Sequence, residues 1–373
     1  MEGRLDARTA GGCNSVMIDT ATRPTGAAVD PVGTLMHAEA AEAGAAVARF
    51  LAANAETLER IGARLRACPP EVVVTCARGS SDHAATYGKY LIETLTGVVT
   101  ASAALSVSSV YAAAPAPTEP GSNRLCIAIS QSGKSPDLLS SVAAQKHAGA
   151  FVVALVNEAE SPLAALADEV LALSAGPERS VAATKSYIAS LAGLAALTAA
   201  WTGDESLAAA LAELPEQLPR AFALDWSAGI PPLLDASSLF VIGRGYGFGV
   251  AQEAALKLKE TCGLHAECFS AAEVKHGPMA IVGEGFPILA FAGSGAAGDD
   301  VRETAELFAS RGARVVLADI DGGEGTLPAL VTHPAIEPIL MIASFYRMAA
   351  FLSVARGFDP DKPPFLAKVT RTK

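Results

Sequence analysis

The most informative stretch of the chain is Ile127-Ala128-Ile129-Ser130-Gln131-Ser132-Gly133-Lys134-Ser135-Pro136-Asp137. Its apolar beginning, from Cys126 to Ile129, predicts a short buried strand, and a loop of small hydroxyl residues follows at once. Ser135 and Pro136 then provide a favourable start for a helix that continues from Asp137 to Ala144. The stretch therefore predicts a strand, a hydroxyl loop and a helix N-terminus in direct succession.

This succession is typical of an anion site. The first N–H groups of a helix have no partner within the helix, and the positive end of its dipole lies beside them. The Gly-Lys-Ser/Thr pattern of a nucleotide-binding loop is missing at the required spacing. The alternative is a tight turn that binds nothing, but four potential donors within six residues favour a phosphate site. These donors are Ser130, Gln131, Ser132 and Ser135.

Composition excludes several classes of protein. The chain has 373 residues, of which 51% are hydrophobic and 18% charged, so it can bury a large core and suggests two domains. Its net charge of −11 argues against a nucleic-acid surface. The six cysteines lack metal-binding spacing, and the simplest interpretation is a reduced, cytoplasmic compartment. Ile188 to Trp201, the most apolar stretch, is too short to span a membrane and predicts a buried helix.

The order of elements indicates an α/β protein. A helical pattern from Thr34 to Leu65 ends before Pro69-Pro70, and residues 72–74 then predict a strand followed by a helix that ends near Leu95. Further strands are expected over residues 98–102, 126–129, 151–156 and 170–173, with a helix from Ser161 and a long helix that ends near Trp201. Alternating strands and helices predict parallel sheets with helices on both faces.

The second half of the chain repeats this plan. Residues 239–245 resemble residues 72–79, residues 287–295 resemble residues 124–133, and residues 312–316 resemble residues 149–153. We therefore predict two tandem, doubly wound, flavodoxin-like (Rossmann-like) parallel-sheet domains, with the hydroxyl loop, and so one phosphate site, only in the first. The expected division is a disordered leader at 1–30, a first domain at 31–205, a second domain at 206–355, and a tail at 356–373 that closes the site.

The glycine cluster from Gly243 to Gly249 suggests a rival function as a dinucleotide loop. Its spacing places Phe248 where the dinucleotide pattern requires glycine, and no acidic residue follows on a second strand about twenty residues later. We instead expect these glycines to permit close packing of a helix on the sheet.

Several motifs together resemble the tandem sugar isomerase (SIS) domain family, and within it the isomerase half of glutamine–fructose-6-phosphate transaminases. The resemblance covers the chain from about Leu35 to its end. It rests on residues 78–81, 130–135, 181–185, 253–260, 265–267, 273–278 and 366–368, which keep their order. The transaminases also carry a glutaminase domain with a Cys after the initial Met, whereas here Met1 precedes Glu2. The chain thus resembles an isomerase half without an ammonia supply, as in SIS-type glucosamine-6-phosphate deaminases and fructosamine-phosphate deglycases.

The resemblance implies four catalytic residues. Glu260 would move the proton between C1 and C2, and Lys257, three residues earlier, shares its helix face; an ordinary surface ion pair is the alternative that the resemblance overrides. His276 would open the sugar ring from the neighbouring subunit, which implies a homodimer. Lys368 would cap the sugar and form a Schiff base with the ketose carbonyl. Without the resemblance, the expectation for a single lysine in a tail is a solvated side chain.

The resemblance also implies the substrate-binding residues. Ser130, Gln131, Ser132 and Ser135 would hold the phosphate with Ser81 nearby, Ser80 would face the sugar hydroxyls, and Gly79 and Val181 complete the set. Ala183 replaces a serine of the transaminase motif, which removes a contact worth about 1 kcal/mol. Lys134 replaces a glutamate and would add positive potential near the phosphate.

The function that the resemblance implies is conversion of glucosamine 6-phosphate and water to fructose 6-phosphate and ammonium, with no metal or organic cofactor. We expect no nucleic-acid or membrane partners. A deglycase or aminating isomerase of a related phosphosugar amine is the nearest alternative. A sugar-phosphate sensor is a third possibility, but a sensor has no need of Glu260, His276 and Lys368 together, and bacterial sensors usually carry a DNA-binding domain, of which this sequence has no sign.

Overall fold

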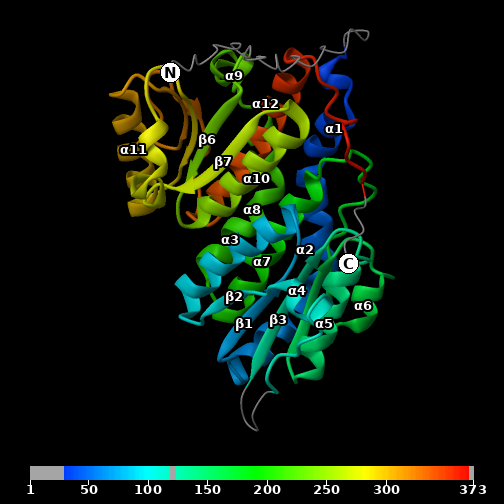
Figure 1. Ribbon diagram of the computed structural model, residues 1–373. Helices are drawn as coiled ribbons and strands as arrows, with labels where there is room; N and C mark the ends of the chain where they lie inside the picture. Colours follow the sequence, from blue (N-terminus) through cyan, green and yellow to red (C-terminus); the bar gives the residue numbers. More distant parts are fainter. Residues whose placement is uncertain (1–28, 118–122, 369–373) are drawn as a thin grey trace, which may run out of the picture.

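The computed structural model describes residues 29–117 and 123–368, and it contains two five-stranded parallel sheets (Figure 1). The strand orders are β2-β1-β3-β4-β5 and β7-β6-β8-β9-β10, so the two sheets have the same topology. This order is that of the flavodoxin-like doubly wound fold, as predicted. The expected leader lies almost wholly outside the described residues.

The first sheet follows the predicted succession of elements, with small changes in their ends. The strand predicted over residues 126–129 is longer, and the one predicted over residues 98–102 is shorter. Its strands are β1 Val72–Cys76, β2 Thr100–Ser102, β3 Arg124–Ser130, β4 Phe151–Val156 and β5 Glu169–Ala172. The helices that connect successive strands of this sheet are α3 Ser80–Thr96, α4 Leu105–Ser109, α5 Pro136–His147 and α6 Pro162–Leu166.

The second sheet is built in the same way. Its strands are β6 Ser238–Gly243, β7 His265–Ser270, β8 Pro287–Ala292, β9 Arg314–Asp319 and β10 Leu327–Pro328. The main helices of this half are α10 Tyr246–Cys262 and α11 Gly295–Ala309; shorter elements are η2 Ser227–Gly229, α9 Pro231–Leu234, η3 Glu273–His276 and η4 Pro278–Ile281.

Equivalent residues of the two halves confirm the internal repeat in atomic detail. Gly79 and Gly245 precede α3 and α10 with φ angles of +55° and +56°, a region that favours glycine. Arg78 pairs with Asp137 on α5 at 2.9 Å in the first half. Arg244 pairs with Asp300 on α11 at 2.7 Å in the second half.

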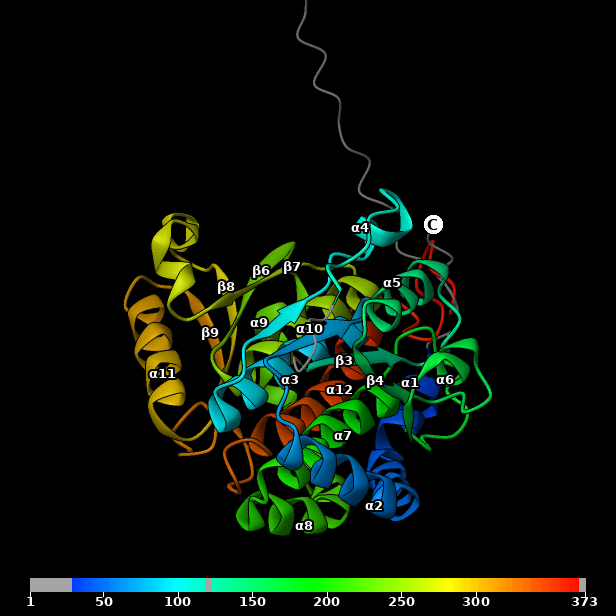
Figure 2. The same cartoon turned by 90° about the horizontal axis from the view of Figure 1, so that it is seen from below.

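Long helices join the two sheets. Helices α7 Lys185–Thr202, α10 and α12 Glu337–Ala355 lie between the sheets in Figures 1 and 2, and α3 packs on α7 and α10. Helix α7 is buried along nearly its whole length, as predicted. Helix α12 is long and apolar enough to cross a membrane, but 78% of that window is buried inside the protein, as in the core helix of a globular fold.

The helical run predicted from Thr34 to Leu65 is two helices rather than one. A 3-10 turn, η1 Pro31–Gly33, precedes α1 Leu35–Ala41, and α2 Ala43–Ala67 follows after Glu42. Helix α2 packs on α7 and on α8 Glu205–Phe222, whereas α1 contacts α12. Apolar periodicity continues through the junction, which is why the sequence pattern did not reveal it.

Two glycines of the cluster, Gly243 and Gly249, permit close packing of α10. A Cβ atom on Gly243, at the end of β6, would lie 2.7 Å from the carbonyl oxygen of Gly247 in α10. A Cβ on Gly249 would lie 2.5 Å from the carbonyl oxygen of His83, so here α10 approaches helix α3 rather than the sheet. This contact brings the two domains together beside the candidate site.

Candidate functional site

A pocket of about 320 Å³ lies at the carboxyl ends of β1 and β3, where the strand order reverses direction. Ligands bind at this point in open α/β sheets. Ten of the twelve predicted site residues line the pocket: Gly79, Ser80, Ser81, Ser130, Gln131, Ser132, Ser135, Val181, Glu260 and Lys368. The remaining walls are Arg78, Ile129, Leu138, Ala183, Leu366 and Ala367.

The hydroxyl loop after β3 is shaped for an anion. The oxygen of Ser130 accepts a hydrogen bond from the N–H of Gly133 at 3.0 Å, which curls the loop. Gly133 has φ +63°, and a Cβ there would lie 2.2 Å from the Ser161 hydroxyl, so only glycine fits. Ser135 occupies the N-cap position of α5, but its side chain makes no capping bond and is therefore free to contact a ligand.

Glu260 reaches the pocket from α10, in the second domain. It pairs with Lys257, which is 1% exposed, so the lysine is buried and this is not the surface pair considered from sequence. Burial by itself lowers the pKa of Lys257, but the carboxylates of Glu253 and Glu260 outweigh it and hold the pKa above its usual range. Lys257 therefore stays protonated beside Glu260, behind the pocket wall.

Glu253 is a central residue of the site that the sequence reasoning did not assign. It is fully buried and lies 3.4 Å from Lys257 across one turn of α10. It also contacts Ser80 in the pocket wall and His83 on α3, both at 3.0 Å. Its position four residues before Lys257 and seven before Glu260, on the same helix face, is the signal that could have identified it.

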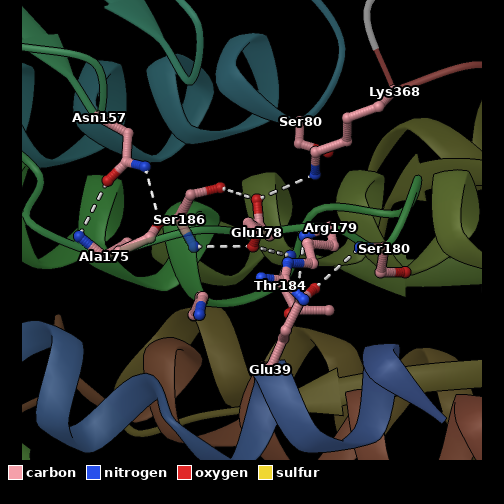
Figure 3. A network of polar contacts seen from close by, with 12 residues as sticks. Glu39, Ser80, Asn157, Ala175, Glu178, Arg179, Ser180, Thr184, Ser186 and Lys368 are labelled. Carbon is pink, nitrogen blue, oxygen red and sulfur yellow. Dashed lines mark hydrogen bonds and ion pairs between the residues drawn. The ribbon is translucent and has the colours of Figure 1, made fainter.

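The C-terminal segment brings Lys368 into the pocket from the far end of the chain. After α12 this segment returns to the first domain (Figure 1). There the ammonium of Lys368 lies 3.3 Å from the buried carboxylate of Glu178 (Figure 3). Lys368 is thus held as half of an ion pair, although its predicted Schiff-base chemistry requires the neutral amine.

Two buried carboxylates shape the loop that carries Val181 and Ala183. Glu178 accepts hydrogen bonds from the N–H groups of Thr184 and Ser186, at 2.9 and 3.2 Å, at the start of α7. Glu39 of α1 accepts from the N–H groups of Arg179 and Ser180 (Figure 3), at 2.5 and 3.1 Å. Burial raises the pKa of Glu39 despite these bonds. The same Glu178 therefore orders the pocket loop and holds Lys368.

Three predicted positions lie differently from the rest. His276 is exposed at the end of η3 and is not among the residues that line this pocket, so its proposed action across subunits stays a prediction. Lys134 is also exposed and outside the pocket lining, where Arg78 is the basic residue of the loop wall. Ala183 does line the pocket, so the serine hydroxyl that it replaces in the transaminase motif would lie in the pocket itself.

In the second domain, a side chain of the protein fills the place equivalent to the anion loop. The carboxylate of Glu337 accepts from the N–H and hydroxyl of Ser294, at 2.7 and 2.6 Å, just before α11. Glu337 is fully buried, and a Cβ on Gly293 would lie 3.1 Å from it. This internal carboxylate explains how the fold is repeated while the open anion loop is not.

Two other hollows lack a loop of hydroxyl residues. A groove of about 530 Å³ between α2, α7 and α8 is lined chiefly by alanine and leucine, and a polar pocket of about 340 Å³ lies between α3, α10 and β7. Within residues 29–117 and 123–368, no group of three or more His, Cys, Asp or Glu side chains is placed to hold a metal ion.

Comparisons with known proteins agree with this architecture. The SIS domain family matches residues 70–200 and 232–321. A candidate phosphosugar isomerase from Silicibacter pomeroyi DSS-3 is 43% identical, with a TM-score of 0.81, over 88% of this chain and 100% of that one. The glucosamine-6-phosphate deaminase of Thermotoga maritima has a TM-score of 0.71 over 91% of this chain and 100% of that one, but at 24% identity it supports the fold alone.

Sequence similarity extends to larger enzymes. The isomerizing glutamine–fructose-6-phosphate aminotransferase of Methanothermobacter thermautotrophicus is 36% identical over 325 residues, which are 83% of this chain and 52% of that enzyme. The chain thus spans about half the length of the curated relatives it matches. From these matches and the two sheets, the chain belongs to the SIS domain family and carries two copies of the domain.

Proposed function

We propose that this protein is a phosphosugar isomerase that deaminates glucosamine 6-phosphate to fructose 6-phosphate and ammonia. The observation that carries the proposal is a single pocket in which the hydroxyl loop of one domain faces Glu260 of the other. A phosphate and a proton-transfer group at opposite walls suit a substrate with its phosphate at one end and its reacting carbons at the other. The substrate class is taken from the relatives named above.

The residues would share the reaction as follows. His276 of the partner subunit opens the ring, and Glu260 removes the proton from C2 and returns it to C1. A second proton passes from the amino nitrogen to O1, which leaves a hydroxyl at C1 and an imine at C2. Lys257 stays protonated and balances the negative charge near Glu260. Lys368 attacks C2, ammonia leaves, and water hydrolyses the lysine imine to the ketone of fructose 6-phosphate. Lys368 must first leave Glu178 and lose a proton.

The direct test follows fructose 6-phosphate and ammonium together after glucosamine 6-phosphate is added to the purified protein. We expect equal amounts of both, and a loss of at least about 100-fold in the Glu260→Gln variant. Glu216→Gln, an exposed glutamate on α8, is the matched control and should keep the activity. Binding of the sugar phosphate without either product would refute the deaminase proposal and leave the sensor or another amino sugar.

A second experiment tests the proposed role of His276 across subunits. Glu260→Gln and His276→Ala proteins should each be inactive alone. After subunit exchange, a mixed dimer holds one site with both natural residues only if His276 acts in the partner's site. Recovery of about a quarter of the natural activity is then expected from a symmetric dimer. No recovery, with exchange verified by mass, would refute the arrangement.

A further inference from the structure

The buried carboxylate of Glu253 makes contacts that restrict what a pocket residue can do. Its Oε1 atom lies 3.0 Å from the hydroxyl of Ser80 and 3.1 Å from that of Tyr346. Its Oε2 atom lies 3.0 Å from Nδ1 of His83, and Lys257 stands 3.4 Å from Oε1. Among these contacts only Ser80 also lines the sugar pocket.

Glu253 is ionised in this setting. Burial would raise its pKa, but Lys257 and the hydrogen bond and charge of His83 outweigh burial and hold the pKa below its usual range. An ionised carboxylate has no hydrogen to give, so the hydroxyl hydrogens of Ser80 and Tyr346 must point at it. His83 must likewise carry a hydrogen on Nδ1, which it does as imidazolium and as one neutral tautomer.

Two pocket serines therefore have opposite hydrogen-bonding roles. Ser80 has given its only hydrogen to Glu253, so towards the pocket it offers lone pairs alone. Ser130 accepts from the N–H of Gly133, and its hydrogen has no acceptor among the described residues, so it can donate to an anion. The hydroxyl loop thus matches a phosphate, whereas Ser80 matches a group that donates.

We propose that Ser80 selects substrates by accepting a hydrogen bond from a sugar hydroxyl or amino group, and that Glu253 is the positioning residue that fixes this polarity. The inference rests on the proposed phosphosugar function. It adds a rule of specificity: at the carbon that Ser80 contacts, a donor is required. A fluorine, a methoxy group or a carbonyl oxygen, which only accept, gain nothing from Ser80.

Binding of unreactive analogues tests this rule without any turnover. Isothermal titration would compare glucose 6-phosphate with its deoxy and deoxyfluoro analogues at C1, C2, C3 and C4 in turn. At the carbon that Ser80 contacts, both analogues should bind about threefold to tenfold more weakly than the parent, and equally so, because fluorine cannot donate. In Ser80→Ala both analogues should bind as tightly as the parent sugar, so the difference disappears. The difference should remain in Ser80→Thr, which keeps a hydroxyl, and in Ser81→Ala, which changes a neighbouring serine of the pocket.

A second variant tests the role of Glu253 directly. In Glu253→Met the side chain offers Ser80 no acceptor oxygen, which frees the serine hydrogen for the ligand. The deoxyfluoro analogue should then bind more tightly than the deoxy analogue, a reversal that a purely structural role would not produce. Circular dichroism would verify that the variant folds, and the Ser80 variants carry the test if it does not.

The outcomes separate this inference from the proposed function. If a deoxyfluoro analogue outbinds its deoxy partner in the natural protein and the difference vanishes in Ser80→Ala, Ser80 donates and the inference is wrong. Equal discrimination in the natural protein and in Ser80→Ala also refutes it, while the phosphosugar function stands. If no phosphosugar binds, the proposed function fails, and the inference falls with it.

Discussion

The buried ion pair of α10 allows a quantitative prediction for Lys257→Met. Methionine keeps most of the side-chain volume but removes the ammonium, which leaves the fully buried Glu253 without its counter-charge. Removing one partner of a buried pair costs about 3–5 kcal/mol. Glu253 retains donors from Ser80, His83 and Tyr346, so we expect the lower end, about 3 kcal/mol.

Urea unfolding followed by circular dichroism measures this loss. With a slope of about 3 kcal/mol per molar urea, the midpoint should fall by about 1 M. Lys259→Met is the matched control, because Lys259 is exposed on the same helix and, among the residues that the structure describes, donates only to the carbonyl of Ala266. Its midpoint should stay within about 0.2 M of the natural value, since such surface changes are usually small.

The double variant completes this test. Adding Glu253→Gln to Lys257→Met removes the uncompensated charge, so part of the lost stability should return. A Lys257→Met protein as stable as the Lys259→Met control would refute the reasoning, because the pair would then contribute nothing despite its burial.

Three further predictions concern charged groups of the site and its repeat. The folded pKa of Glu253 lies below its ordinary value of 4.5, so the stability that its ionised carboxylate contributes is present above that pH and is lost as the pH falls further. The melting temperature of the natural protein should therefore drop more steeply below about pH 4.5 than that of Glu253→Gln. Parallel curves would contradict this. Borohydride reduction with fructose 6-phosphate should attach the sugar to Lys368, a mass change absent in Lys368→Met; labelling at another lysine would exclude the proposed imine. Glu337→Ala should lose about 1–3 kcal/mol of stability, because Ser294 loses its partner, and inorganic phosphate should raise its melting temperature more than that of the natural protein; an equal response would show that the loop cannot hold an anion.

Local sequence patterns were sufficient for the fold and for the hydroxyl loop of the pocket, whereas the other predicted pocket residues were taken from the family resemblance. The apolar run before Ser130 and the hydroxyl loop after it form a strand and loop where expected. The repeated Arg-Gly pairs at Arg78 and Arg244 mark equivalent turns. Such features are encoded within a few neighbouring residues, so periodicity and turn chemistry reveal them.

The charge network behind the pocket could not be predicted in the same way. Glu253 meets Ser80, His83 and Tyr346 across separations of 173, 170 and 93 residues, which no local pattern records. The contact of Lys368 with Glu178 spans 190 residues. These partners become neighbours only after the domains pack, so the protonation and the hydrogen-bond polarity of the site are properties of the tertiary structure.

The contact between Glu337 and Ser294 affects how well the protein tolerates damage to its binding site. A duplicated domain can supply a second copy of a binding site. Here the loop of the second repeat is occupied by Glu337, and this repeat instead contributes the helix that bears Lys257 and Glu260. Either repeat alone would hold only half of the pocket. The second repeat therefore cannot replace the function of Ser130 if that residue is lost from the first repeat. The duplicated architecture provides no second phosphate site.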